Sequence, residues 1–408
     1  MRHSAIHDAN RPAKKVARRD LLALAIAAPA AAVLLPTKVA AGPRTLPPRY
    51  WTQRIDSSAL RPIHASELAA GSAVRGLQEQ RLLSTGPIST GAFRRMAVSW
   101  PEGTPANRIP QVLLRTRSRT GWSQWSTLHL DSHGPDHSSA EARTSRPTVH
   151  SAMVEPSEEL ELVLAPSSDV SLDVNVHFIQ PGTELSSSAA TSMAASSVDS
   201  EQPAILTRKD WGADETIRES GEPDYGQIRG AFVHHTADPN SYSTDDVPAI
   251  IRSIYVYHVR TRGWRDIGYN FLVDRFGRIW EGRYGGIDEP VVGAHTGGYN
   301  SSSFGAAVIG TYTTKTPEQV VLRAYRRLIA WKFSMHNVHP LSLVNYPDQK
   351  TLPAISGHRD TKATECPGQH LYDALQMLRH DVYLATRIDR RRTVAPQIGS
   401  RPVIPPTG

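Results

Sequence analysis

Cysteine is almost absent from this sequence, and the central part of the chain has no excess of positive charge. The 408 residues include one cysteine, which excludes a disulfide-stapled scaffold and any cysteine-rich zinc finger. The formal net charge of +7 comes from the two ends, because residues 1–41 and 387–408 hold the excess of Lys and Arg and residues 42–386 are slightly acidic. The calculated pI of about 9.5 suggests a nucleic-acid-binding protein, but the body of the chain lacks the basic surface that such a protein needs.

Long apolar runs are also scarce. The run Leu21–Leu35 is shorter than the roughly 20 residues that span a bilayer, and it lies between a basic start and the small residues Val39-Ala40-Ala41. This order is typical of an export signal, with Arg18-Arg19 in the place of a twin-arginine motif. We predict a twin-arginine-like export signal over 1–41, a secreted or cell-wall location, and no transmembrane segment in the mature chain. A general secretory signal and an uncleaved anchor are the alternatives.

Composition divides the rest of the chain into five parts. Residues 42–84 give no clear period and are left unassigned. Residues 85–181 show short alternating runs, which predict a small, sandwich-like all-β domain. The Ser- and Ala-rich stretch 182–203 is typical of a flexible linker. Residues 204–386 interleave strands with amphipathic helices and predict an α/β domain with a central mixed β-sheet flanked by helices. The Arg- and Pro-rich tail 387–408 is expected to be disordered.

Two segments of the α/β part carry side chains that could bind a metal or take part in catalysis. Phe232-Val233-His234-His235 has the character of a strand, in which consecutive side chains point to opposite faces. The single cysteine, Cys366, follows His358 across a loop that ends in Pro-Gly. Two histidines and a thiolate that converge from separate elements would form a zinc site with an open fourth position. A buried, structural cysteine is the alternative.

Six motifs follow one another along residues 204–383. They are Arg208-Lys209-Asp210-Trp211-Gly212-Ala213, Val233-His234-His235-Thr236-Ala237, Asp266-Ile267-Gly268-Tyr269-Asn270-Phe271, Gly277-Arg278-Ile279-Trp280-Glu281-Gly282-Arg283, Gly293-Ala294-His295-Thr296-Gly297-Gly298-Tyr299-Asn300, and Gly357-His358-Arg359-Asp360 through Cys366-Pro367-Gly368. In this order they resemble the peptidoglycan recognition protein and type 2 N-acetylmuramoyl-L-alanine amidase family. Nothing before about residue 200 takes part in the resemblance.

The resemblance implies a zinc amidase. Carried onto this sequence, it implies that His234, His358 and Cys366 bind Zn²⁺, and it places Tyr269 and Thr364 beside the metal as catalytic residues that hydrogen-bond the developing oxyanion. The implied reaction is hydrolysis of the amide between N-acetylmuramic acid and the L-alanine of the peptidoglycan stem peptide. Family members that only bind peptidoglycan typically lack the cysteine. Cys366 therefore favours a hydrolase over the alternative, a non-catalytic peptidoglycan-binding receptor.

Four further residues are candidates for substrate binding. His235 and His295 lie in the motifs, and a supporting or structural role is the alternative for each. Arg283 and Tyr284 lie where some relatives read the third residue of the stem peptide. The implied partner is the muramyl-peptide of peptidoglycan, and we expect a monomer. The choice between diaminopimelate and lysine stem peptides stays open. The proton acceptor also stays open, because strand 305–310 contains no carboxylate.

Overall fold

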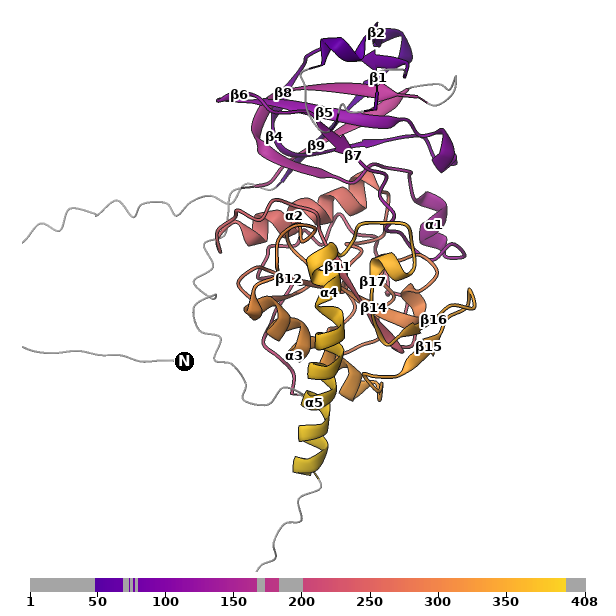
Figure 1. Cartoon of the computed structure of the whole chain (residues 1–408), viewed down its shortest axis with the longest axis vertical. Helices are drawn as coiled ribbons and strands as arrows, with labels where there is room; N and C mark the ends of the chain where they lie inside the picture. Colours follow the sequence, from indigo (N-terminus) through magenta and orange to yellow (C-terminus); the bar gives the residue numbers. More distant parts are fainter. Residues whose placement is uncertain are drawn as a thin grey trace, which may run out of the picture. The chain divides into compact units, whose positions relative to one another are not determined.

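The N-terminal half of the chain folds into an antiparallel sheet. The structure, a computed structural model, describes residues 48–68, 73, 76, 77, 80–166, 173–182 and 201–393. Within these residues, hydrogen bonds link nine strands into one sheet (Figure 1). The strands are β1 (Arg49–Ile55), β2 (Arg61–Ile63), β3 (Leu82–Ser84), β4 (Ile88–Ser99), β5 (Gln111–Ser118), β6 (Gly121–Trp122), β7 (Ser126–Leu128), β8 (Ala152–Ala165) and β9 (Val174–Gln180). The predicted all-β region is confirmed.

The core of this sheet follows the period-two pattern of its strands. Leu160, Leu162 and Leu164 of β8 are fully buried and pack in one cluster with Val176 and Phe178 of β9. The residues between them in β8 face the opposite side, where a second, smaller cluster forms. Strand β8 therefore buries both faces over part of its length, which explains the weak alternation of its sequence there.

The sheet begins earlier than the predicted all-β region. Strand β1 pairs with β9 along its whole length, and β2 pairs with β3, which pairs with β8. Residues 42–84, which the sequence left unassigned, thus contribute three strands. The partners of β1 and β3 in β9 and β8 lie far away in the chain, so local sequence pattern does not reveal these pairings.

The C-terminal half contains the predicted mixed sheet. Its strands have the order β10-β13-β12-β14-β11-β17, and all described pairs are parallel except β12 with β13. The strands are β10 (Ile205–Leu206), β11 (Gly230–His235), β12 (Phe271–Val273), β13 (Ile279–Glu281), β14 (Ser303–Val308) and β17 (Ile355–Gly357); β15 (Leu343–Asn345) and β16 (Thr351–Pro353) form a separate hairpin. The α/β fold class is confirmed.

Helices cover both faces of the mixed sheet (Figure 1). Helix α2 (Val247–Val256) packs on one face with Leu272 and Ala307, and continues as a π-helical turn over Tyr257–Thr261. Helices α3 (Gln319–Met335) and α5 (Leu375–Thr393) pack on the other face with Val273 and Val308. The two short helices are α1 (Ala140–Thr144) and α4 (Gln369–Asp373).

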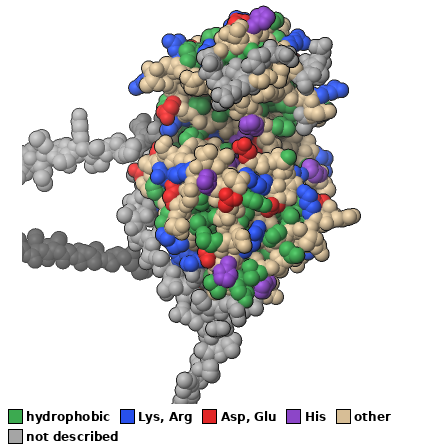
Figure 2. Space-filling view, viewed as in Figure 1, with side chains coloured by type: hydrophobic (Ala, Val, Ile, Leu, Met, Phe, Trp, Pro, Cys, Tyr) green, Lys and Arg blue, Asp and Glu red, His purple; other side chains and the backbone are tan. Residues whose placement is uncertain are grey.

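The two halves make direct contacts and belong to one compact unit, Pro43–Gly408. Arg95 of β4 is paired with Asp238 at 2.8 Å, and both side chains are almost completely buried. Arg95 also donates to Ser253 of α2 and to Ser151. On the face drawn in Figure 2, basic and acidic side chains of the described residues are interspersed rather than separated. This mixture is consistent with the slightly acidic charge of residues 42–386.

Several predicted segments fall outside the described residues. These are the export signal at 1–41 and nearly all of the linker at 182–203. Helix α5 runs to Thr393, so the first part of the predicted disordered tail is helical and that prediction was wrong for 387–393. In the described part of the chain, no helix combines the length and the apolar character required to cross a membrane.

Candidate metal centre

Three elements bring the predicted ligands to one point. His234 lies near the end of β11, His358 directly follows β17, and Cys366 lies in the loop before α4. The Nδ1 atom of His234 is 3.6 Å from the Sγ atom of Cys366, and the ring centroids of His234 and His358 are 4.8 Å apart. All three side chains are buried. Because β11 and β17 are parallel neighbours, their carboxyl ends meet at one edge of the sheet, which places both histidines there.

The electrostatics of this cluster suit a cation. Both ring nitrogens of His358 are buried without a hydrogen-bond partner among the described residues. Burial and the neighbouring imidazoles lower the pKa of His234 and of His358 well below the usual value, so each ring presents a free lone pair at neutral pH. Burial raises the pKa of the Cys366 thiol, and a bound divalent ion would supply the charge that deprotonates it. Two imidazoles and a thiolate match the donor set of zinc.

A fourth residue, His133, joins the cluster from the N-terminal half. One nitrogen or sulfur atom of each of His133, His234, His358 and Cys366 lies within 4.8 Å of the others. The Nε2 atom of His133 is 4.0 Å from the Sγ atom of Cys366, and its ring centroid is 4.4 Å from that of His358. Sequence reasoning missed His133, because all six motifs lie after residue 204. The available signal was Asp131-Ser132-His133, where a carboxylate stands close enough to orient an imidazole.

The two predicted catalytic residues border the cluster. The hydroxyl of Tyr269 is 3.4 Å from Nε2 of His133, and its ring packs against His133 and His234. Burial and the nearby Cys366 raise the pKa of Tyr269 well above the usual value, so its phenol stays protonated at neutral pH. Thr364 is half-buried, and its hydroxyl oxygen accepts a hydrogen bond from the backbone N–H of Cys366.

A cavity of about 690 Å³ adjoins the cluster. Cys366, Thr364 and His235 line it from the C-terminal half, and Ser132 and His133 line it from the N-terminal half, together with residues 126–130 and 150–153. The cavity gives small molecules a path to the sulfur of Cys366.

His295 and His235 are not members of the cluster. His295 is fully buried, its Nδ1 is 3.1 Å from Nε2 of His234, and burial lowers its pKa to about 3. Gly305 permits this contact, because a Cβ there would lie 2.3 Å from the His295 ring. His235 shares a strand face with Val308, opposite to His234. Its Nδ1 accepts a hydrogen bond from the backbone of Tyr312. His295 is thus enclosed by the protein, whereas His235 borders the cavity.

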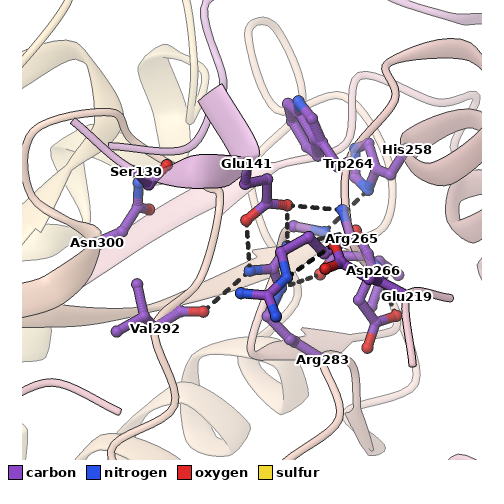
Figure 3. Close-up of polar contacts among 12 residues, drawn as sticks. Ser139, Glu141, Glu219, His258, Trp264, Arg265, Asp266, Arg283, Val292 and Asn300 are labelled. Carbon is purple, nitrogen blue, oxygen red and sulfur yellow. Dashed lines mark hydrogen bonds and ion pairs between the residues drawn. The ribbon is translucent and has the colours of Figure 1, made fainter. Parts of the chain in front are cut away.

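Arg283 and Tyr284 lie apart from the cluster. Arg283 is buried, and Glu141 of α1 binds its guanidinium through both carboxylate oxygens, at 2.5 and 3.1 Å (Figure 3). The same guanidinium donates to the carbonyl oxygens of Ile267 and Val292. Tyr284 is 37% exposed and stacks against Arg218. Of the candidate substrate-binding residues, Tyr284 is therefore accessible and Arg283 is covered by a residue of the N-terminal half.

Known proteins resemble the C-terminal half of the chain. A family model described as N-acetylmuramoyl-L-alanine amidase matches residues 224–369. The human N-acetylmuramoyl-L-alanine amidase is 37% identical over 182 residues, which cover 44% of this chain and 29% of the human protein. Peptidoglycan-recognition protein LB of Drosophila melanogaster is 32% identical over 195 residues, which cover 48% of this chain and 77% of that protein. A solved structure of wild-type Drosophila PGRP-LB covers 42% of this chain and 92% of its own, with 33% identity and a TM-score of 0.35.

The matched segment contains the predicted site but not its fourth member. His234, Tyr269, His358, Thr364 and Cys366 all lie inside residues 224–369, and His133 lies outside them. The N-terminal contribution to the cluster is thus a property that the family model does not describe.

Proposed function

Because the chain belongs to the family of N-acetylmuramoyl-L-alanine amidases and peptidoglycan recognition proteins, we propose that it is an exported, zinc-dependent amidase. Its substrate would be the amide between N-acetylmuramic acid and the L-alanine of the peptidoglycan stem peptide. The observation that carries this proposal is the convergence of His234, His358 and Cys366 in one buried cluster. A protein that only binds peptidoglycan does not need this donor set.

The residues of the cluster support hydrolysis. His234, His358 and Cys366 would hold the ion, and His295 fixes the orientation of the His234 ring through its hydrogen bond. Zinc bound there would supply Lewis acidity, which polarises the amide carbonyl and lowers the pKa of a water molecule. Tyr269 keeps its proton at neutral pH and can donate a hydrogen bond to the carbonyl oxygen as negative charge develops. Thr364, on the wall of the adjoining cavity, is the second candidate donor.

Substitution of a metal ligand tests the proposal. Cys366→Ser should reduce both zinc content and the release of stem peptides from peptidoglycan, the latter by at least about 100-fold. His370→Ala is the matched control, because His370 is exposed and lies in α4, just after the cysteine loop. Stem-peptide release that is unchanged in Cys366→Ser would overturn the metal assignment. Retained zinc and wall binding without any release, in the wild type, would identify a receptor instead.

Export by the twin-arginine route is part of the proposal and rests on residues 1–41 alone. Replacement of Arg18 and Arg19 by Lys should keep the protein inside the cell, because that route requires the arginine pair. The measurement is the amount of protein in the medium and wall fractions. Normal secretion of the double variant would contradict this route.

A further inference from the structure

A segment of the N-terminal half lies across the candidate metal centre. We call residues 131–146 the strap; they include helix α1. Along its length the strap bonds to residues 257–301 of the C-terminal half. Its backbone carbonyls at His133 and Gly134 accept from Arg262 and Asn300, and the backbone N–H of Arg146 donates to the carbonyl of Arg262. These contacts fix the strap at several points.

The strap holds His133 in the orientation of a metal ligand. Asp131 accepts a hydrogen bond from Nδ1 of His133 at 2.7 Å, which leaves the lone pair of Nε2 directed at the cluster. Asp131 is itself held by Arg262 at 2.7 Å and by the hydroxyl of Tyr257 at 2.8 Å. A carboxylate that orients a histidine in this way is a recurrent feature of zinc sites.

Two acidic residues further along the strap bind groups of the C-terminal half. Asp136 accepts from the backbone N–H groups of Gly298, Asn300 and Ser301 at 2.7 to 3.0 Å. Glu141 binds the guanidinium of Arg283 and accepts from the backbone N–H of Arg265 at 3.0 Å (Figure 3).

The chain around these contacts is shaped to receive the strap. At Gly297, a Cβ would lie 2.8 Å from the carbonyl oxygen of Pro135. At Gly263, where φ is +75°, a Cβ would lie 2.4 Å from the carbonyl oxygen of Thr144. A side chain at either position would therefore push the strap away.

We propose that the strap keeps the metal centre closed, with His133 as a fourth protein ligand. The consequence of this closure is a latent enzyme, and that consequence rests on the proposed amidase function. Zinc sites with four protein ligands are of the structural type, whereas catalytic sites keep one position for water or substrate. His133 takes that position and contacts the hydroxyl of Tyr269. Glu141 pairs with the guanidinium of Arg283. Hydrolysis then requires the strap to move away from the cluster.

The coordination of the metal tests this proposal without any measurement of activity. In the zinc-loaded full chain, X-ray absorption should report one sulfur ligand and the outer-shell scattering of three imidazole rings. One sulfur with the outer-shell scattering of two imidazole rings would overturn the proposal. This measurement needs no variant, so it remains decisive even if a substitution prevents folding.

Cobalt-loaded variants give a second readout. Imidazole should reach the ion through the adjoining cavity and shift the visible spectrum of His133→Ala, because that variant has an open fourth position. It should leave the wild type unchanged. His137→Ala is the matched control, because His137 is an exposed histidine of the same strap, and it should behave as the wild type. An equal shift in the wild type and in His133→Ala would overturn the assignment.

Release of the strap tests latency. Glu141→Gln weakens the pair with Arg283 and changes no metal ligand, so we expect faster hydrolysis, by about fivefold or more. Glu159→Gln is the control, because Glu159 pairs with Arg117 in an exposed position of the β-sheet. A lower or unchanged rate in Glu141→Gln would contradict latency. No hydrolysis by any variant, together with the expected cobalt spectra, would overturn the amidase function and leave coordination by His133 standing.

Discussion

The buried pair Arg95–Asp238 should hold the two halves of the chain together, and its removal should measurably lower the free energy of unfolding. The side chains are 1% and 0% exposed and 2.8 Å apart. Arg95→Met leaves Asp238 buried with neither carboxylate oxygen bonded to a partner within the described residues, because Oδ2 already has none. Breaking a buried pair on one side costs about 3–5 kcal/mol. We expect this loss in the free energy of unfolding, measured by urea denaturation of the full chain.

Two comparisons test the reasoning behind this number. Arg117→Met is the control, because the Arg117–Glu159 pair is 52% and 30% exposed and should be worth no more than about 1 kcal/mol. The double variant Arg95→Met/Asp238→Ala should lose less stability than Arg95→Met alone, since it leaves no unpaired buried charge. A loss below about 1 kcal/mol in Arg95→Met, or a double variant that is less stable than Arg95→Met, would refute the argument.

Three further predictions concern pH, zinc and Tyr269. Burial lowers the pKa of His177 to about 4, so its contribution to stability is complete above pH 6.5 and is lost as the pH falls to 4. The loss is about 3 kcal/mol, and His177→Gln should flatten this part of the stability–pH curve measured by denaturation. Free zinc at about 100 times its dissociation constant should stabilise the fold by about 2.7 kcal/mol relative to the chelated protein; equal melting temperatures would argue against a folded-state metal site. Tyr269→Phe should reduce kcat by about 10²–10³ with a smaller change in KM, through loss of an oxyanion donor; a wild-type kcat would remove Tyr269 from the reaction.

The sequence allowed prediction of the C-terminal half because its signals are local. The strand Gly230–His235 is a short apolar run, and the alternation of side chains separates His234 from His235. Cys366 stands out as the single cysteine. The same local reasoning placed the strap residues in an ordinary β-region, because nothing near His133 in the sequence indicates that its partners lie after residue 230.

Arg283 illustrates the same limit at the level of one residue. Its motif position predicted a role in substrate binding, and the structure instead shows its guanidinium bound to Glu141, a residue far away in the chain. Whether a side chain is accessible depends on long-range packing, which a single sequence does not encode in any short window. Strands β1 and β3 in residues 42–84 were missed for the same reason, since they pair with the distant strands β9 and β8.

The most direct test of the amidase function is the chemistry of the released fragments. Purified full-length protein and the His133→Ala variant would be incubated with peptidoglycan, after chelation and again after zinc is restored, and the soluble products analysed by mass spectrometry. We predict stem peptides with free L-alanine amino termini that appear only when zinc is present, and sooner with the variant. If neither protein releases such peptides although both contain zinc and bind the walls, the chain is a peptidoglycan receptor and not an amidase.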